Sequence, residues 1–388
     1  MVHFTVTLST RTALFLRYSV ELCVVHDLSF PEGLSVNDGI SSDYYLEQFC
    51  NLHLPGIDRL VEFVNAKGRG CHVFKKDLQR AYRQIPINPQ DYPLLGLYID
   101  GSLYFHTALP SGLRSATMIC QRTTKNVAYI LNTDGISVDV YIDDFYGAES
   151  TDLSDLSFQR MNSLFAELGL MDAPEKDSPP SHEMLCLGIW INTLDMTLSV
   201  PAFRVEELQL ELNTWLTKCS FTKRELQQLL GKLSFVSACV QPGRAFMSRL
   251  LNALRSCSSA HWQTIHPISE DLRADINWWQ YFLSQYNGVS VIPSDVIVSN
   301  PELFATDACL TGCSAVCFRE CFQREFLDFI LTQERHINEL ELLTVVVSIK
   351  LWAPKLQGLG VELLSDNTSC VSVINSQHSP NVFMQRCL

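Results

Sequence analysis

Two adjacent carboxylates, Asp143 and Asp144, stand within residues 138–146 (VDVYIDDFY), a run otherwise rich in β-branched and aromatic side chains. This composition predicts a strand, a turn and a second strand, with the carboxylates at the turn. Neighbouring carboxylates repel each other, and partial burial raises the pKa of one of them unless a cation lies beside them. Mg²⁺ is such a cation, because it prefers one or two carboxylates together with substrate phosphates. Asp is also a favoured turn residue, so the pair alone is compatible with a solvated turn.

Three further motifs surround this pair in the chain. Residues 73–82 (VFKKDLQRAY) place an Asp after an apolar entry and an aromatic residue five positions later. Residues 109–121 (LPSGLRSATMICQ) predict a turn that leads into a helix. Residues 185–191 (LCLGIWI) predict another strand, and Lys176 stands in the loop before it. Each motif alone is a weak signal, whereas four of them in one order are specific.

In this order the motifs resemble the palm of a reverse transcriptase. The resemblance implies that Asp77 is the first metal-binding carboxylate and that residues 141–144 are the Tyr-x-Asp-Asp box. Asp143 would bind the metal ions directly, and Asp144 would support the same cluster less directly. Phosphoryl transfer to a primer 3′-hydroxyl needs mainly positioning and charge stabilisation, which two metal ions about 3.5–4 Å apart supply. Mg²⁺ is the expected cofactor, with Mn²⁺ as the alternative.

The same resemblance assigns the remaining residues of this site. Tyr82 matches the aromatic residue under the incoming sugar, where a flat ring favours deoxynucleotides, and ordinary packing is its alternative interpretation. Arg114 and Gln121 belong to the segment that contacts nucleotide and template, and residues 187–188 match the primer grip. Lys176 matches the lysine proposed to protonate the leaving pyrophosphate, and a solvated loop lysine explains it equally well.

A second set of carboxylates follows near the end of the sequence. Asp307 ends one strand-like run, Asp366 ends another, and Glu341 lies in an expected helix between them. Asn338 and Glu341 have the spacing of a capping box at the start of this helix. Apolar residues at three- and four-residue spacings predict its buried face. They are Leu340, Leu343, Val347 and Leu351.

Carboxylates on a strand, a helix and a strand resemble the ribonuclease H fold, whose two-metal site hydrolyses the RNA strand of an RNA–DNA hybrid. The resemblance implies that Asp307, Glu341 and Asp366 are three of its metal ligands. Glu339 competes with Glu341 for the middle position, but the sequence Glu-Leu-Leu-Thr from residue 341 fits the family's helix better. A cap at the helix start is the alternative interpretation of Glu341.

Several short segments resemble the reverse transcriptases of DIRS-type retrotransposons, which integrate with a tyrosine recombinase. These segments are residues 27–33, 35–40, 229–235, 242–246, 336–338 and 350–352. The resemblance covers roughly residues 21–388, nearly the whole sequence. The recombinase is absent from it, so we expect a fragment of a larger polyprotein or a genomic remnant.

Departures from the family pattern bear on activity. Cys23 occupies the place of a fingers arginine that grips the incoming triphosphate, and Thr117 replaces the usual proline. Residues 1–20 match nothing in the family, and the sequence ends at Leu388, before the fourth acidic residue of a ribonuclease H site. We therefore expect intact polymerase carboxylates, compromised fingers and an incomplete nuclease site.

Length and composition predict a multidomain α+β protein. A chain of 388 residues with 47% hydrophobic content supports two to four subdomains. We expect right-hand polymerase fingers and palm over residues 21–200 and a helical thumb or connection over 201–290. A ribonuclease H-like α/β domain, incomplete at its C-terminus, follows over 300–388, and residues 1–20 stay unassigned. The sequence lacks a membrane-length apolar run and a basic leader, so we expect an intracellular protein, cytoplasmic or nuclear and not secreted.

Net charge is the global property that disagrees with a nucleic-acid enzyme. The formal net charge is −13, whereas such enzymes usually have a basic footprint. Lysines and arginines nevertheless gather around Asp77 and again over residues 218–255, where they would contact phosphates. In this second region Thr222 and Glu225 have capping-box spacing, and the helix that they open has a clear apolar stripe. The stripe consists of Leu226, Leu229, Leu230 and Leu233.

The fourteen cysteines raise three alternatives: disulfides, a metal site or packing. Disulfides are disfavoured in a chain without a secretory signal. Cys309, Cys313, Cys317 and Cys321 recur every fourth residue, a spacing that differs from the paired halves of zinc sites. Buried thiols behave as small hydrophobic groups, so core packing is the expected role of these four residues.

The sequence thus predicts a retroelement RNA-directed DNA polymerase that binds an RNA or DNA template-primer and dNTPs, with an associated ribonuclease H-like domain. Other retroelement proteins are candidate partners, and a membrane is not expected as one. The alternative is an inactive retroelement remnant that at most binds nucleic acid. Cys23 favours this alternative, and intact Asp77, Asp143 and Asp144 oppose it. A stand-alone two-metal nuclease would need a complete ribonuclease H site.

Overall fold

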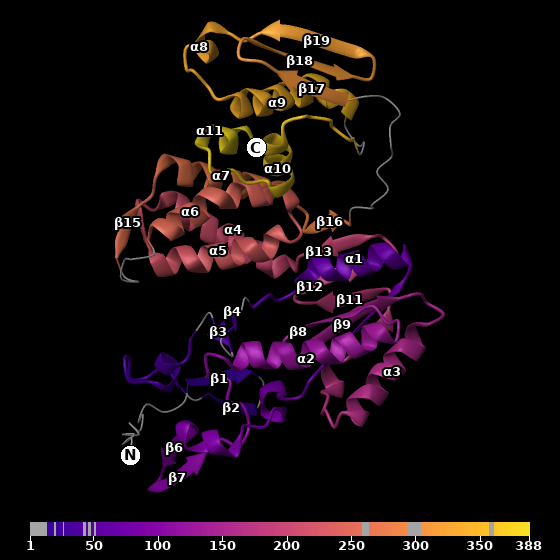
Figure 1. The fold of residues 1–388 in the computed structure, drawn as a ribbon, viewed down its shortest axis with the longest axis vertical. Helices are drawn as coiled ribbons and strands as arrows, with labels where there is room; N and C mark the ends of the chain where they lie inside the picture. Colours follow the sequence, from indigo (N-terminus) through magenta and orange to yellow (C-terminus); the bar gives the residue numbers. More distant parts are fainter. Residues whose placement is uncertain are drawn as a thin grey trace. The chain divides into compact units, whose positions relative to one another are not determined.

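A computed structural model shows the chain as two compact units, Met1–Thr197 and Leu198–Leu388, which are described separately (Figure 1). Both units mix helices and strands. The structure describes residues 14–18, 21–25, 27–41, 44–45, 48–49, 52–257, 264–292, 304–356 and 361–388. No helix in these ranges is both long enough and apolar enough to cross a membrane.

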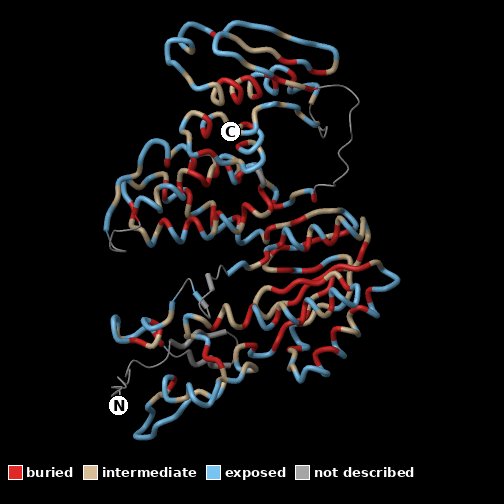
Figure 2. Tube along the Cα trace, in the orientation of Figure 1, coloured by how far each residue is buried: buried red, intermediate tan, exposed pale blue. Residues whose placement is uncertain are grey.

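The centre of the first unit is a four-stranded antiparallel sheet in the order β10–β5–β9–β8. Its strands are β5 (His72–Asp77), β8 (Val138–Tyr141), β9 (Asp144–Glu149) and β10 (Ser178–Ser181). The strand, turn and strand predicted around Asp143 are confirmed as β8 and β9. The residues of β9 after Asp144 are all buried, because layers of chain cover both faces of the sheet (Figure 2).

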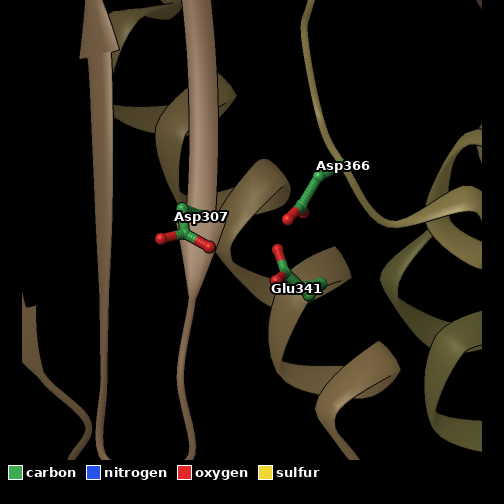
Figure 3. Close-up of side chains that lie close together, drawn as sticks. All are labelled: Asp307, Glu341 and Asp366. Carbon is green, nitrogen blue, oxygen red and sulfur yellow. The ribbon is translucent and has the colours of Figure 1, made fainter.

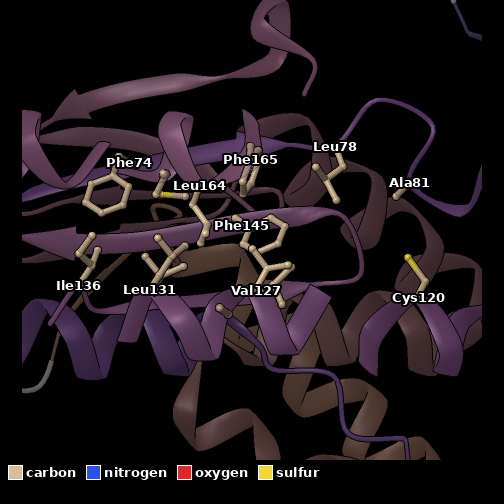
Figure 4. Close-up of a cluster of buried hydrophobic side chains, with 14 residues drawn as sticks. Phe74, Leu78, Ala81, Cys120, Val127, Leu131, Ile136, Phe145, Leu164 and Phe165 are labelled. Carbon is tan, nitrogen blue, oxygen red and sulfur yellow. The ribbon is translucent and has the colours of Figure 1, made fainter. Parts of the chain in front are cut away.

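Helices α2 (Ala116–Thr133) and α3 (Ser154–Glu167) pack on one face of this sheet and form a hydrophobic core with it (Figure 4). The core joins Phe74 and Phe145 from the sheet to Val127 of α2 and Phe165 of α3. The helix predicted to run through Gln121 is confirmed as α2. Helix α1 (Ile57–Lys67) packs against β9.

The remaining elements of the first unit are short. Four strand pairs are hairpins: β1 (Leu14–Tyr18) with β2 (Glu21–Val25), β3 (Tyr44–Tyr45) with β4 (Gln48–Phe49), β6 (Gly96–Ile99) with β7 (Ser102–Phe105), and β11 (Glu183–Cys186) with β12 (Ile189–Asn192). Cys23 lies within β2. The 3₁₀ turns are Val36–Gly39, Ala81–Gln84, Pro89–Leu95 and Pro174–Lys176, and strand β13 (Thr197–Ser199) spans the boundary between the units.

The second unit begins with a helical bundle. Its elements are α4 (Ala202–Thr217), β14 (Ser220–Thr222), α5 (Lys223–Ser237), the 3₁₀ turn Gln241–Met247, α6 (Ser248–Ser256), β15 (Ile265–Pro267), α7 (Glu270–Gln285) and β16 (Val289–Val291). The capping box of Thr222 and Glu225 is confirmed at the start of α5, and the four leucines of its predicted stripe are buried. Gly243 allows close packing here, because a Cβ at this position would lie 2.2 Å from the buried Trp279 ring.

An antiparallel three-stranded sheet and four helices complete the second unit. The elements are β17 (Phe304–Ala308), β18 (Gly312–Cys317), β19 (Glu320–Glu325), α8 (Asp328–Leu331), α9 (Ile337–Leu356), α10 (Thr368–Ser376) and α11 (Val382–Cys387). Helix α9 lies between the sheet and the two last helices (Figure 1). Trp352 packs on Phe304 and Cys317 of the sheet, whereas Leu342 packs on Val373 of α10.

Two expectations about α9 are wrong. The helix starts at Ile337, so Asn338 lies inside it and is not its N-cap. The buried face is also displaced from the predicted stripe: Val347 and Leu351 are exposed, and Leu343 is only partly buried. The buried positions are Leu340, Glu341, Leu342, Thr344, Val345, Ser348 and Trp352. Because neighbours cover two sides of the helix, its apolar residues do not mark a single face.

The expectation that the four regularly spaced cysteines pack in a core is correct only for Cys317. Cys317 is fully buried in the core under the sheet, and Cys313 is half-buried. Cys309 lies in the turn after β17, and Cys321 lies on β19; both are exposed. The period of four crosses two turns between the strands, so it does not keep the thiols on one face.

Candidate active sites

The first candidate site lies where β5 and β9 meet the β8–β9 turn. Asp77, the last residue of β5, pairs directly with Asp144, the first residue of β9. Asp143 occupies the turn, where its carbonyl oxygen accepts a hydrogen bond from the Leu78 N–H at 3.1 Å. Asp77 therefore joins the adjacent pair Asp143 and Asp144, 66 and 67 residues later in the sequence, at one end of the sheet.

The turn itself is strained, because Ile142 has a φ of 59°. A β-branched residue rarely adopts this left-handed conformation, and the surrounding structure must hold it in place. Gln121 of α2 provides that support. Its side chain is 3% exposed, its Oε1 accepts from the Ile142 N–H at 2.6 Å, and its Nε2 donates to the Val140 carbonyl at 2.8 Å. The amide of Gln121 thus contacts the backbone of the hairpin on both sides of Tyr141.

The carboxylates of this site interact unfavourably with one another. Burial raises the pKa of Asp144 to about 6, with smaller contributions from Asp77 and Asp143, although Lys75 opposes the shift. Burial and the neighbouring Asp77 also raise the pKa of Asp143. The Lys75 ammonium lies 3.8 Å from Asp144 Oδ1 and is the nearest cationic partner of that residue in the described part of the chain. This crowding of partly buried carboxylates favours binding of a cation.

Lys176 adds a second positive charge on the Asp77 side. Its ammonium donates to Asp77 Oδ1 at 3.2 Å, while 59% of its side chain remains exposed. Burial lowers the pKa of Lys176, but the carboxylates of Asp77, Asp143 and Asp144 outweigh this effect and raise it above its ordinary value. Lys176 is therefore a protonated group that reaches the carboxylate cluster from solvent.

The other residues expected at this site lie around it. Tyr82 is half-buried, its hydroxyl is 3.4 Å from Thr117 Oγ1, and burial raises its pKa. Thr117, which departs from the family proline, therefore contacts the expected sugar-facing residue. The exposed Arg114 guanidinium donates to the Ile40 carbonyl at 2.9 Å. The single strand predicted over residues 185–191 is wrong: residues 187–188 form the turn between β11 and β12, with φ values of 48° and 81° that suit a tight hairpin.

Sequence reasoning missed Asn37, which joins the N-terminal segment to this region. Asn37 is buried, its Oδ1 accepts from the Arg114 N–H at 2.7 Å, and its Nδ2 donates to the Gly112 carbonyl at 3.0 Å. The resemblance to the DIRS class could have indicated this residue, because Asn37 lies in one of the segments that carry the resemblance. Its partners 75 and more residues away were not visible in the sequence.

The second candidate site is formed by Asp307, Glu341 and Asp366 (Figure 3). Asp307 lies near the end of β17, and Glu341 lies in the second turn of α9. The strand expected before Asp366 is reduced to an isolated parallel bridge between Ala305 and Leu364. One oxygen from each carboxylate lies within 4.8 Å of the other two. Among the described residues this is the only such group, and the carboxylates of the first site are not all this close.

Glu341 is the buried member of this cluster, with 4% exposure. Burial, reinforced by Asp307 and Asp366, raises its pKa, although a hydrogen bond from the Ala308 backbone opposes the shift. Its Oε2 atom is buried without a hydrogen-bond partner. A buried carboxylate oxygen with this deficit is a suitable ligand for a divalent cation, so the three residues fit a Mg²⁺ or Mn²⁺ site.

Neighbouring residues distinguish Glu341 from its competitor Glu339. The Glu339 carboxylate binds Arg335 at 3.1 Å and Asn381 at 2.7 Å, away from the cluster. Asn338 does not cap the helix as predicted. Instead, its Oδ1 accepts a hydrogen bond from Asn367 Nδ2 at 2.9 Å. Asn367 is the N-cap of α10 and directly follows Asp366. The bond therefore ties the Asp366 segment to the first turn of α9.

Comparison with known proteins places this geometry in context. No family model matches the chain. Polyprotein P3 of Commelina yellow mottle virus is 25% identical over an alignment of 291 residues, which covers 73% of this chain and 14% of the polyprotein. The chain therefore spans about a seventh of that relative's length.

Two solved structures have a similar fold. The foamy viral protease-reverse transcriptase dRH in complex with double-stranded DNA gives a TM-score of 0.51 at 15% identity, covering 92% of this chain and 58% of that chain. The foamy viral protease-reverse transcriptase in complex with double-stranded DNA gives 0.50 at 14% identity, covering 92% and 68%. These similarities show an α+β chain with the polymerase fold of the two structures, and they confirm the fold class expected from the sequence.

Proposed function

We propose that this chain is an RNA-directed DNA polymerase that transfers a nucleotide from a dNTP to a primer 3′-hydroxyl. The observation that carries the proposal is the placement of Asp77, Asp143 and Asp144 at one end of the β5–β9–β8 sheet, with raised pKa values at Asp143 and Asp144. Divalent cations held there would stabilise charge on the attacking and leaving oxygens. The similarity to reverse-transcriptase structures supports the same conclusion at the level of fold.

The neighbouring residues have separate proposed roles. Lys176, a protonated ammonium beside Asp77, would donate a proton to the leaving pyrophosphate. Tyr82 would lie under the incoming sugar, and Arg114 would contact the nucleotide once its hydrogen bond to Ile40 is exchanged. For Gln121 we propose an indirect role in place of nucleotide contact. Its amide is hydrogen-bonded to the β8–β9 hairpin, so it would hold the carboxylates of Asp143 and Asp144 in place.

We also propose that Asp307, Glu341 and Asp366 form a ribonuclease H-like site that binds Mg²⁺ or Mn²⁺. Their mutual distances, within 4.8 Å, and the unpartnered buried Oε2 of Glu341 support the assignment. The cations would activate a water for attack on an RNA phosphodiester. The three carboxylates would hold the cations, and Asn338 and Asn367 would keep Asp366 in reach of Glu341.

The DIRS-type assignment, the subdomain limits and the partners remain parts of the proposal. The fingers and palm would occupy residues 21–200, the thumb or connection 201–290 and the nuclease-like domain 300–388. RNA or DNA template-primers and dNTPs would be the substrates. The two similar structures are complexes with double-stranded DNA, which supports duplex binding here. An inactive remnant that only binds nucleic acid is the alternative, favoured by Cys23 in place of the fingers arginine.

Primer extension on a poly(rA)–oligo(dT) duplex with Mg²⁺ tests the polymerase proposal, with the Asp143→Asn, Asp144→Asn double variant as control. Extension by the native chain that is lost in the double variant supports the proposal. Binding of the duplex without any extension, at several Mg²⁺ and Mn²⁺ concentrations, would favour the inactive remnant. Neither extension nor binding would contradict both functions.

A further inference from the structure

Lys76 carries a buried charge directly beside the first candidate site. It precedes Asp77 in β5, and its side chain is 1% exposed. The ammonium contacts the carboxylates of Asp172, at 2.7 Å, and Asp177. The rings of Phe158 and Phe165 lie 5.1 and 5.8 Å from it. Because successive residues of a strand point to opposite faces, Lys76 lies on the α3 side of the sheet, away from Asp77.

This arrangement is difficult to explain as a device for stability alone. Removing an ammonium and its carboxylates from water costs free energy, and apolar residues of similar volume often stabilise a core equally well or better. The remaining bonds of Asp177 suggest a different role. Its Oδ1 accepts a hydrogen bond from the Asp77 N–H at 3.2 Å, while its Oδ2 contacts the Lys76 ammonium. One carboxylate thus joins the buried lysine to the backbone of the carboxylate residue at the site.

Lys176 directly precedes Asp177 and ends the 3₁₀ turn Pro174–Lys176. At the start of this turn, the Ala173 N–H donates a hydrogen bond to the Asp77 carbonyl at 2.9 Å. At its end, Asp177 accepts from the Asp77 N–H, and the Lys176 ammonium lies 3.2 Å from Asp77 Oδ1. The turn is therefore bonded to Asp77 at both ends, and Asp177 provides the backbone bond at the Lys176 end.

We propose that Asp177 is a positioning residue: anchored by buried Lys76, it fixes the Asp77 backbone and the adjacent Lys176 so that both side chains face the site. This inference rests on the proposed polymerase function. It adds two residues, Lys76 and Asp177, that touch neither nucleotide nor metal ion. Changes at Asp177 should act on catalysis through the geometry of Asp77 rather than through substrate binding.

Asp172 provides a matched control. It contacts the same ammonium as Asp177, yet within the described part of the chain only Asp177 accepts a hydrogen bond from the Asp77 N–H. Asp172→Ala and Asp177→Ala each remove one carboxylate from Lys76, so they disturb the buried charge in a similar way. Only Asp177→Ala also removes the acceptor of the Asp77 N–H. The two variants therefore separate positioning from charge pairing.

Two readouts distinguish the outcomes. In single-nucleotide extension, Asp177→Ala should lower kcat by about 10- to 100-fold while the KM for dNTP changes little, and Asp172→Ala should stay within about threefold of the native chain. In a Mn²⁺ titration followed by electron paramagnetic resonance, Asp177→Ala should weaken binding about 10-fold. The titration uses chains that also carry Asp307→Asn and Asp366→Asn, so that the second carboxylate cluster does not compete for the ion.

The Mn²⁺ titration keeps this inference separate from the proposed function, because it needs no polymerase activity. Equal Mn²⁺ affinities for Asp177→Ala and Asp172→Ala would overturn the inference even if the native chain extends primers. Equal losses of kcat in both variants would overturn it as well. If Asp177→Ala fails to fold, Asp177→Asn decides in comparison with Asp172→Asn, because the single amide oxygen of Asn cannot both contact the Lys76 ammonium and accept from the Asp77 N–H. A larger loss of Mn²⁺ affinity in Asp177→Asn than in Asp172→Asn supports the inference, and equal affinities overturn it.

Discussion

Replacing Asp144 by Asn should stabilise the chain in the absence of divalent cations. The pKa of Asp144 rises from its ordinary 3.8 to about 6 in the folded state, mainly because the carboxyl group is buried. A carboxyl group with a raised pKa favours folding when it is protonated, and this contribution is lost as the pH rises through about 6. At neutral pH the ionised Asp144 is therefore a destabilising group, held beside Asp77 and Asp143 for a purpose other than stability.

The magnitude follows from the difference between the two pKa values. A folded value of about 6 against 3.8 unfolded corresponds to about 3 kcal/mol of destabilisation at pH 7.5, and to about half of that at pH 5. Asn has the size of Asp without its charge. The increase in the free energy of unfolding that Asp144→Asn produces should therefore be larger at pH 7.5 than at pH 5, by about 1–2 kcal/mol.

Urea unfolding in EDTA at pH 5 and pH 7.5 measures this difference. Asp195→Asn, an exposed carboxylate of the same unit, is the control and should show almost no dependence on pH in the comparison. Stabilisation by Asp144→Asn that is equal at the two pH values would refute the electrostatic reasoning. Destabilisation at pH 7.5 would show that the Asp144 carboxylate contributes more through its contact with Lys75 than it loses by burial.

Three further predictions concern the two units separately. Gln121→Met should lower the free energy of unfolding by about 1–3 kcal/mol, because the Ile142 N–H and the Val140 carbonyl lose their hydrogen-bond partner. It should also slow primer extension. Urea unfolding and extension rates measure the two effects. Gly243→Ala should destabilise the second unit by about 1–3 kcal/mol, because the added Cβ would overlap the Trp279 ring. Gly231→Ala is the control and should not destabilise it, because a Cβ at residue 231 meets nothing within 4 Å. Thermal unfolding of both variants measures the difference. Glu341→Gln should abolish the rise in melting temperature that Mn²⁺ produces through the second cluster, measured in chains carrying Asp143→Asn and Asp144→Asn.

Local features of the fold were predictable because their signals are local. The β-branched and aromatic run around Asp143 specified two strands and their turn, and the spacing of Thr222 and Glu225 specified the start of α5. Each signal acts within about ten residues, through backbone preference or a single cap. The order of the motifs then allowed the polymerase fold to be inferred by resemblance, and the similar structures support that fold.

The features that escaped prediction depend on what packs on each side of an element. Helix α9 is apolar on several sides because the sheet covers one face and α10 and α11 cover another, so its spacing pattern pointed to exposed residues such as Val347. Asn338 had the type and spacing of a cap, but its partner is Asn367, 29 residues later. The bond between Asp177 and the Asp77 backbone spans 100 residues, and no local pattern in the sequence indicates it.

The proposed division of labour between the two carboxylate clusters can be measured on one substrate. An RNA–DNA hybrid with separate labels on the RNA template and the DNA primer reports extension and RNA cleavage in the same reaction. We predict that Asp77→Asn abolishes extension and leaves cleavage intact, while Asp307→Asn abolishes cleavage and leaves extension intact. Loss of neither activity in either variant, or extension by the Asp77→Asn chain at the native rate, would contradict the assignment of the first cluster as a polymerase site.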